Sequence, residues 1–302
     1  MATGIDDARA DARARDAALP DIDWMLVPEG VEKGWHDAPS GRLATLSAGD
    51  PSAPRVLLVP GVTGSKEDFV LMLPLLAAAG YRAESFDMAG QFESSGAGPE
   101  NLRPPRRHYD HDLFVDDLVS VLEAGSSPVH VLGYSFAGTV AQIAYSRRPE
   151  LFASLALLSA PPEPGQGFRG VKVLGPFTGL ASGRVGAALM IWGVRNNMNK
   201  VPPGRLRLAR HRFGFTRRDS VSDIISLMKR APDHRALLAA SRMPKLVAVG
   251  EHDLWPLELH KGLADAIGAR LAVYPTGHSP CETTPHELVL DLIETYESAP
   301  SA

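Results

Sequence analysis

The stretch His130-Val-Leu-Gly-Tyr-Ser-Phe-Ala-Gly138 decides the fold of this chain. It passes from an apolar strand through a turn of small residues around Ser135 into a predicted helix. Small residues at Gly133 and Ala137 permit a turn so tight that its central residue is strained. We expect Ala137 to be tolerated because it carries only a Cβ, and Gly138 to let the helix pack closely on the neighbouring strand. Such a turn is typical of a nucleophile elbow, which lifts the Ser135 hydroxyl out of the sheet edge.

Buried strands alternate with helices on both sides of this stretch. The apolar runs predict strands at residues 55–60, 81–87, 128–133, 155–158, 245–250 and 270–274. Helices are predicted after Ser65 through Ala79 and at residues 112–123, 135–145, 257–267 and 286–296. Residues 24–46 predict a hairpin of two edge strands. The alternation predicts an α/β fold with a parallel sheet.

The alternation breaks at Pro161-Pro-Glu-Pro-Gly165 and resumes at Pro244. The residues between mix Gly, Arg and aromatic side chains without a clear strand, and we interpret residues 163–243 as an inserted, basic, mostly helical lid. Residues 1–20 alternate Ala with Asp and Arg, which predicts a mobile tail or a short, weakly held helix. The α/β core then comprises residues 21–162 and 244–302.

The composition narrows the class of protein. At 302 residues and 44% hydrophobic, the chain is long enough to bury a sizeable core. Its single cysteine, Cys281, excludes an intramolecular disulfide, and no spacing suggests metal ligands. No apolar run approaches the roughly 20 residues that cross a membrane. We therefore expect a cytoplasmic protein with no cofactor, metal, membrane span or nucleic-acid partner.

The charge is distributed unevenly along the chain. Residues 163–243 hold 15 Lys or Arg against 4 Asp or Glu, whereas the rest of the chain holds 16 basic and 31 acidic residues. The basic segment either lies on an acidic body and presents a solvated face, or attracts an anionic substrate. Both interpretations stay open at this point.

Two residues far along the chain could activate Ser135. A serine hydroxyl is a poor nucleophile at neutral pH, so it requires a base and a group that orients the base. Asp253 follows the strand at 245–250 and His278 follows the strand at 270–274. Because the carboxyl ends of parallel strands meet at one edge of a sheet, we expect the three side chains to converge there. His278 would take the proton of Ser135, and Asp253 would hold the imidazole.

A tetrahedral intermediate also needs donors for its oxyanion. The backbone amide of Phe136 comes just after the nucleophile, and that of Val62 lies in the Gly-rich loop after the first buried strand. Gly61 allows this loop to approach closely.

Other residues compete for these roles or lie close by in the sequence. Glu163, just past the strand that follows the elbow helix, is the rival to Asp253. His108 and His111 lie in a polar loop that could line the site. Cys281 is interpreted as a small packing residue, because nothing nearby lowers its pKa.

Four motifs together resemble the α/β-hydrolase superfamily over residues 55–298: GYSFAG, VPGVTGS, GEHDLWP and PTGHSP. The resemblance implies an eight-stranded, mostly parallel sheet flanked by helices. It also implies a lid after the strand that follows the elbow helix, and the triad of Ser135, Asp253 and His278. Two features depart from the family pattern: Pro60-Gly61 replaces the His-Gly of many relatives, and the loop 87–94 replaces a turn that contains Arg-Gly.

These observations predict a serine hydrolase that cleaves an ester or thioester of a small-molecule acyl substrate, which the basic lid allows to be anionic. Its activity should rise between roughly pH 6 and 8 as His278 loses its proton. Acyl transfer, perhydrolase or cofactor-free haloperoxidase-like activity and carbon–carbon bond hydrolysis use the same residues, and a non-catalytic binding module is a further alternative. The residues expected to line the pocket are Gly61, Trp192, Phe213 and Trp255. A serine at position 135 argues against dehalogenase or epoxide hydrolase chemistry, for which relatives use a carboxylate nucleophile.

Overall fold

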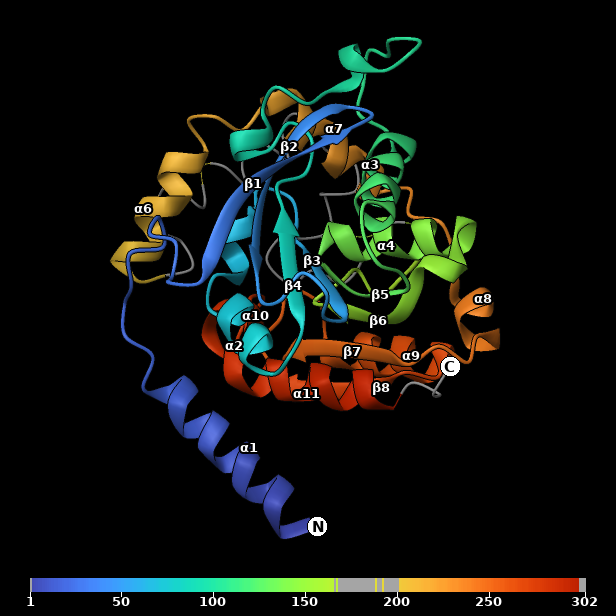
Figure 1. The fold of residues 1–302 in the computed structure, drawn as a ribbon. Coiled ribbons are helices and arrows are strands. Elements are labelled where there is room, and N and C mark those ends of the chain that lie inside the picture. Colours follow the sequence, from blue (N-terminus) through green and yellow to red (C-terminus); the bar gives the residue numbers. More distant parts are fainter. Residues whose placement is uncertain (1, 166, 168–187, 189–191, 193–200, 299–302) are drawn as a thin grey trace.

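An eight-stranded sheet forms the centre of the molecule (Figure 1). The computed structural model describes residues 2–165, 167, 188, 192 and 201–298. The strands are β1 (Val31–Ala38), β2 (Gly41–Ala48), β3 (Arg55–Val59), β4 (Arg82–Phe86), β5 (Val129–Tyr134), β6 (Phe152–Leu158), β7 (Lys245–Gly250) and β8 (Arg270–Tyr274). Their order is β1-β2-β4-β3-β5-β6-β7-β8, and only the pairs β1–β2 and β2–β4 are antiparallel. The predicted eight-stranded, mostly parallel sheet is confirmed.

The central strands read as continuous apolar runs because both of their faces are covered. Every residue of β3, β5 and β7 is buried. Side chains alternate between the two faces, so Leu57 and Val131 enter one core while Leu58 and Leu132 enter the other. The loops that follow these strands therefore supply the polar groups at the carboxyl edge of the sheet.

Helices cover both faces of the sheet (Figure 1). Apolar side chains of α3, α4 and α9 pack in one core, and those of α2 and α11 pack in the other. The α-helices of the core are α2 (Met72–Ala78), α3 (His111–Glu123), α4 (Phe136–Arg147), α9 (Leu257–Ile267), α10 (Pro280–Thr283) and α11 (Pro285–Glu297). Short 3₁₀ turns are η1 (Lys66–Phe69), η2 (Phe92–Ser94), η3 (Pro99–Asn101) and η4 (Pro149–Leu151).

The helix predicted after Ser65 is divided in two by the structure. The 3₁₀ turn η1 comes first, and α2 begins only at Met72. Pro74 has no N–H with which to continue a helical ladder back to Val70, but it is tolerated in the first turn of α2. The break leaves η1 and the loop before it at the carboxyl edge of the sheet.

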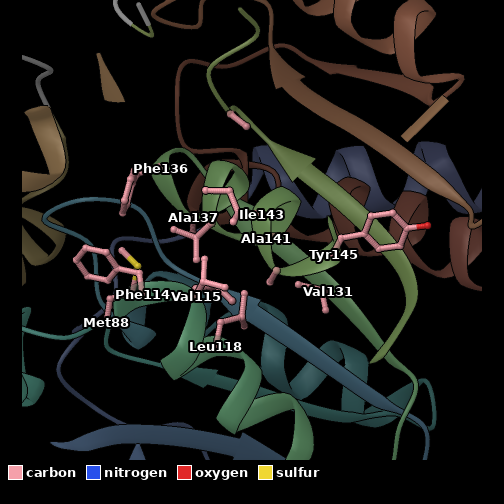
Figure 2. Packing of buried hydrophobic residues seen from close by; sticks show 14 of the residues in the cluster. Met88, Phe114, Val115, Leu118, Val131, Phe136, Ala137, Ala141, Ile143 and Tyr145 are labelled. Carbon is pink, nitrogen blue, oxygen red and sulfur yellow. The ribbon is translucent and has the colours of Figure 1, made fainter. Parts of the chain in front are cut away.

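Side chains of α3 and α4 pack together and hold α4 in place (Figure 2). Phe114 of α3 meets Phe136, the first residue of α4, edge to face at a ring separation of 5.4 Å. Figure 2 also shows Leu118 of α3 and Ala137 of α4 in this cluster. The contacts fix the start of α4, directly after Ser135.

The described part of the predicted lid is helical. Between β6 and β7, residues 163–243 (hereafter the insert) include α6 (Pro203–Arg212), α7 (Arg218–Met228) and α8 (Arg235–Ala240). Residues 166, 168–187, 189–191 and 193–200 of the predicted lid lie outside the described residues. None of the described helices is long and apolar enough to cross a membrane.

Of the two alternatives for residues 1–20, the structure has a helix, α1 (Ala2–Ala17). Arg9 pairs with Asp291 at 2.8 Å and with Glu294 at 2.7 Å, both on α11. Asp16 accepts hydrogen bonds from the backbone N–H groups of His286 and Glu287 in the first turn of α11. Charged groups rather than an apolar stripe thus hold α1 on α11.

Candidate active site

Ser135 occupies a strained turn between β5 and α4. Its φ of 53° and ψ of −121° lie in a region that side-chain-bearing residues rarely adopt. Two backbone hydrogen bonds stabilise the turn, from Ser135 N to Leu158 O and from Gly138 N to Ser135 O, both 2.9 Å long. The surrounding fold therefore imposes the conformation that the small-residue pattern predicts.

The small residues of this turn are required by close backbone contacts. A Cβ on Gly133 would lie 2.6 Å from Ala137 O, and one on Gly138 would lie 2.5 Å from the Cβ of Ala160. Ala160 follows β6, so Gly138 allows α4 to approach that strand, as expected. Ala137 itself is fully buried and fits the position where the usual motif has glycine.

The loop after β3 approaches Ser135 closely. A Cβ on Gly61 would lie 2.9 Å from the Cβ of Ser135. Gly64 N donates to Gly61 O at 3.0 Å, which closes the turn, and Thr63 N donates to Gln91 Oε1 at 3.1 Å. Within the described part of the chain, the N–H groups of Val62 and Phe136 donate to no side chain. Val62 and Phe136 thus keep amides with which an oxyanion could be bound.

Asp253 and His278 meet at the carboxyl ends of β7 and β8. The loops that carry them pack tightly, since a Cβ on Gly250 would lie 1.9 Å from Gly277 O. His278 Nδ1 lies 2.5 Å from Asp253 Oδ1. Burial alone would raise the pKa of Asp253, but hydrogen bonds from His260 and His278 outweigh it and hold that pKa at about 2. Asp253 is therefore ionised at neutral pH and can orient an imidazole.

Two aromatic rings surround His278. The ring of Tyr134, the neighbour of Ser135 in the chain, lies 5.3 Å from that of His278. Trp255 is buried 5.8 Å from His278, and its Nε1 donates to Gly167 O at 2.7 Å. Tyr134 Oη also shares a 2.8 Å hydrogen bond with Ser279 Oγ. These contacts bring His278 to the end of β5, directly before Ser135.

The remaining residues predicted for the pocket lie in the insert. Phe213 is buried at the end of α6. Trp192 is 57% exposed, and its neighbours in sequence lie outside the described residues.

The insert contacts the core through buried polar groups. Arg205 Nη2 and Arg212 Nη1 of α6 each lie 2.7 Å from Asp68 Oδ1, and Arg205 also pairs with Glu282. Asp68 Oδ2 in turn accepts from Ser65 N, next to the loop that carries Val62. Part of the positive charge of the insert is therefore neutralised by acidic groups of the core.

A second contact joins α7 to the same loop. Gln91 Nε2 donates to Ser220 Oγ at 2.7 Å, while Gln91 Oε1 accepts from Thr63 N. Sequence reasoning missed Gln91, because a glutamine in a loop carries no signal of its partners.

Sequence reasoning also missed His260. Its Nε2 lies 2.8 Å from Asp253 Oδ2. The available signal was its place on the apolar face of α9, in register with Leu263 and Ile267 and seven positions after the predicted acid.

The structure also places three further candidates from the sequence. Glu163 lines a small cavity with Asp233 and Arg235. The exposed His108 lies 3.4 Å from Asp223, and His111 stacks on Phe136 at 6.3 Å.

Cys281 is buried, and burial raises the pKa of its thiol well above its ordinary value. A packing role fits this environment better than a reactive one. Among the described residues, no group of three His, Cys, Asp or Glu side chains could hold a metal ion.

Comparison with known proteins gives one family match. A model described as the alpha/beta hydrolase family matches residues 56–292. "Probable oxidoreductase EphD" of Mycobacterium tuberculosis (strain ATCC 25618 / H37Rv) is 33% identical over 131 residues, which are 41% of this chain. The match spans only 21% of the length of that relative.

Two solved structures share the fold. The enol-lactonase from Burkholderia xenovorans LB400 has a TM-score of 0.69 at 17% identity, over 88% of this chain and 100% of that one. A thermophilic esterase from Thermogutta terrifontis has a TM-score of 0.67 at 19% identity, over 89% of this chain and 100% of that one.

Proposed function

The chain belongs to the alpha/beta hydrolase family, and on this premise we propose that it is a serine hydrolase that cleaves a carboxylic ester or thioester through an acyl-enzyme intermediate. The observation that carries the proposal is the 2.5 Å contact between Asp253 and His278, at the edge of the sheet where Ser135 occupies its strained turn. The lactonase and esterase activities named for the two structural neighbours support ester chemistry.

In this mechanism Ser135 Oγ attacks the carbonyl carbon while His278 Nε2 takes its proton. The imidazolium is stabilised by the ionised Asp253. The amides of Val62 and Phe136 bind the oxyanion, and because they are held before the reaction, little reorganisation is needed.

Collapse of the tetrahedral intermediate breaks the bond to the alcohol or thiol, which leaves with the proton from His278. Water then attacks the acyl-enzyme with His278 again acting as base, and Ser135 recovers its proton as the acid is released. The proposed substrate is a small acyl compound.

We propose further that the insert is a lid over this site, with Trp192, Phe213 and Trp255 near the acyl group. Two contacts support this role: α6 contacts Asp68 of η1, and α7 packs against Val62 and reaches Thr63 through Gln91. From the composition, we also propose an anionic substrate and a cytoplasmic location.

Other reactions are compatible with the same residues. Acyl transfer, peracid formation and carbon–carbon bond hydrolysis differ in the acceptor or in the bond that is broken, so product analysis separates them. A non-catalytic binding module would retain the fold without a reactive serine.

A fluorophosphonate tests for the reactive serine directly, because it phosphonylates an activated serine hydroxyl. We expect one equivalent to label Ser135, as located by peptide mass spectrometry. Ser135→Ala and His278→Ala should each abolish labelling, since removal of either group eliminates a working nucleophile.

The matched control is Ser159→Ala. Ser159 is also buried, directly follows the neighbouring strand β6 and has a positive φ of 43°. It should leave labelling unchanged. A folded wild-type protein that takes up no label would overturn the serine hydrolase proposal and favour the binding module.

A further inference from the structure

Two imidazoles, rather than one, hold the carboxylate of Asp253. His278 lies on Oδ1 at 2.5 Å and His260 lies on Oδ2 at 2.8 Å. The side chains of Asp253 and His260 are both completely buried. We propose that His260 is a positioning residue for the hydrolase reaction, which orients the carboxylate of Asp253 so that Oδ1 faces His278. This inference rests on the proposed function.

The hydrogen bond determines which nitrogen of His260 carries the proton. Asp253 is ionised and can only accept, so Nε2 of His260 must donate. Among the residues that the structure describes, Nδ1 of His260 is buried and has no hydrogen-bond partner. A second proton there would bury both an unpaired N–H group and a positive charge, which is costly. We therefore take His260 as neutral, with its proton on Nε2.

The neutral state is what a positioning role requires. A cationic His260 would offset the negative charge of Asp253 and weaken its attraction for the imidazolium form of His278. A neutral donor instead fixes the plane of the carboxylate and leaves its charge in place. With a single partner, the carboxylate could rotate about its Cβ–Cγ bond and lose alignment with His278.

The packing around His260 makes this orientation rigid. His260 lies on the buried face of α9 together with Leu263, Ala264 and Ile267. The ring of Trp255 lies 6.2 Å from that of His260 and 5.8 Å from that of His278, so one indole contacts both imidazoles.

Two amide variants separate positioning from simple packing. The terminal N–H₂ of His260→Gln can occupy the place of Nε2 and donate to Asp253, whereas that of His260→Asn corresponds to Nδ1 and falls short. Both variants introduce a polar amide into the same buried site. His130→Asn is the matched control, because His130 is a buried histidine whose Nδ1 contacts Ser154 and not Asp253.

The measurements are the rate of fluorophosphonate labelling, kcat and KM with p-nitrophenyl acetate, and thermal unfolding of each variant. We expect His260→Asn to slow labelling and lower kcat by about 10- to 100-fold, with KM within about threefold, as loss of a hydrogen bond to a charged group predicts. His260→Gln should keep both rates within about fivefold of the wild-type protein. His130→Asn should keep them as well.

The outcomes distinguish this inference from the proposed function. If the wild-type protein is not labelled, the proposed function fails and the role of His260 fails with it. If the wild-type protein is labelled but folded His260→Asn reacts equally fast, or if the Gln and Asn variants lose activity equally, His260 is a packing residue only. Should His260→Asn not fold, His260→Leu provides the variant without a donor, and equal rates for Leu and Gln would overturn the inference.

Discussion

At the residue scale, Gly61 lies so close to Ser135 that position 61 has little room for a side chain. A Cβ on Gly61 would also lie 3.2 Å from Tyr134 O, so the Gly61 loop or the Ser135 turn must shift if one is added. We expect Gly61→Ala to lower kcat by about 100-fold, because displaced oxyanion donors lose much of their effect. The measurement is kcat with an ester substrate, alongside thermal unfolding.

Gly96→Ala is the control, since a Cβ on Gly96 meets nothing within 4 Å. A Gly61→Ala protein with wild-type kcat would argue against Val62 as an oxyanion donor.

The low pKa of Asp253 predicts how stability and activity depend on pH. A folded-state value of about 2 is below the ordinary value for aspartate, so Asp253 stabilises the folded protein above about pH 4, and this contribution is lost as the pH falls towards 2. Asp253 is therefore ionised at any pH well above 2. The acid limb of kcat/KM should therefore report an imidazole and lie well above pH 4. A limb with its midpoint below pH 4 would contradict this assignment.

At the scale of elements, a buried carboxyl joins the β1–β2 turn to α3. Ser40 N donates to Asp117 Oδ1 at 3.0 Å, and Ser40 Oγ donates to Oδ2 at 2.6 Å. Burial nevertheless raises the pKa of Asp117 to about 7. An unfolded aspartate ionises near pH 4, so the stability of the folded protein falls as the pH rises from about 4 to about 7.

Asp117→Asn removes this pH dependence. We expect the variant to be more stable than the wild-type protein at pH 8, by up to about 4 kcal/mol, and to lose the advantage near pH 4. Urea unfolding at the two pH values measures the difference. Asp116→Asn, on the exposed face of the same helix, should show no comparable gain, and an equal gain there would refute the argument.

At the scale of the whole molecule, Asp68 connects the insert to the core. Arg205 and Arg212 both donate to it, and they lower its pKa although burial opposes this. Asp68→Asn leaves two buried guanidinium groups with less negative charge between them. We expect a loss of about 3 to 5 kcal/mol in the free energy of unfolding, measured in urea.

An exposed ion pair on the core serves as the control for Asp68→Asn. Asp112 contacts Arg147, and both side chains are at least 41% exposed, so Asp112→Asn should cost less than about 1 kcal/mol. If both variants lose the same free energy of unfolding, the contacts of Asp68 with Arg205 and Arg212 do not hold the insert on the core.

The sequence predicted much of this molecule, because its signals are local. Strand β7 (245–250), helix α9 (257–267) and strand β8 (270–274) have the bounds that apolar periodicity predicts. The glycines around Ser135 indicated a tight turn for the same reason, since the steric requirement lies within a few residues of the chain.

The tertiary structure alone decided which distant polar groups meet. Three contacts could not be predicted from a repeating pattern in the sequence: His260 with Asp253, Gln91 with Ser220, and Arg9 of α1 with α11. Such contacts depend on the relative placement of whole elements, which the packing of the two cores sets. By itself, the sequence determined the sheet and the three residues proposed to react, because apolar patterning and turn sterics act locally. Only the fold determined how those residues are held, because buried hydrogen bonds join groups that the chain keeps far apart.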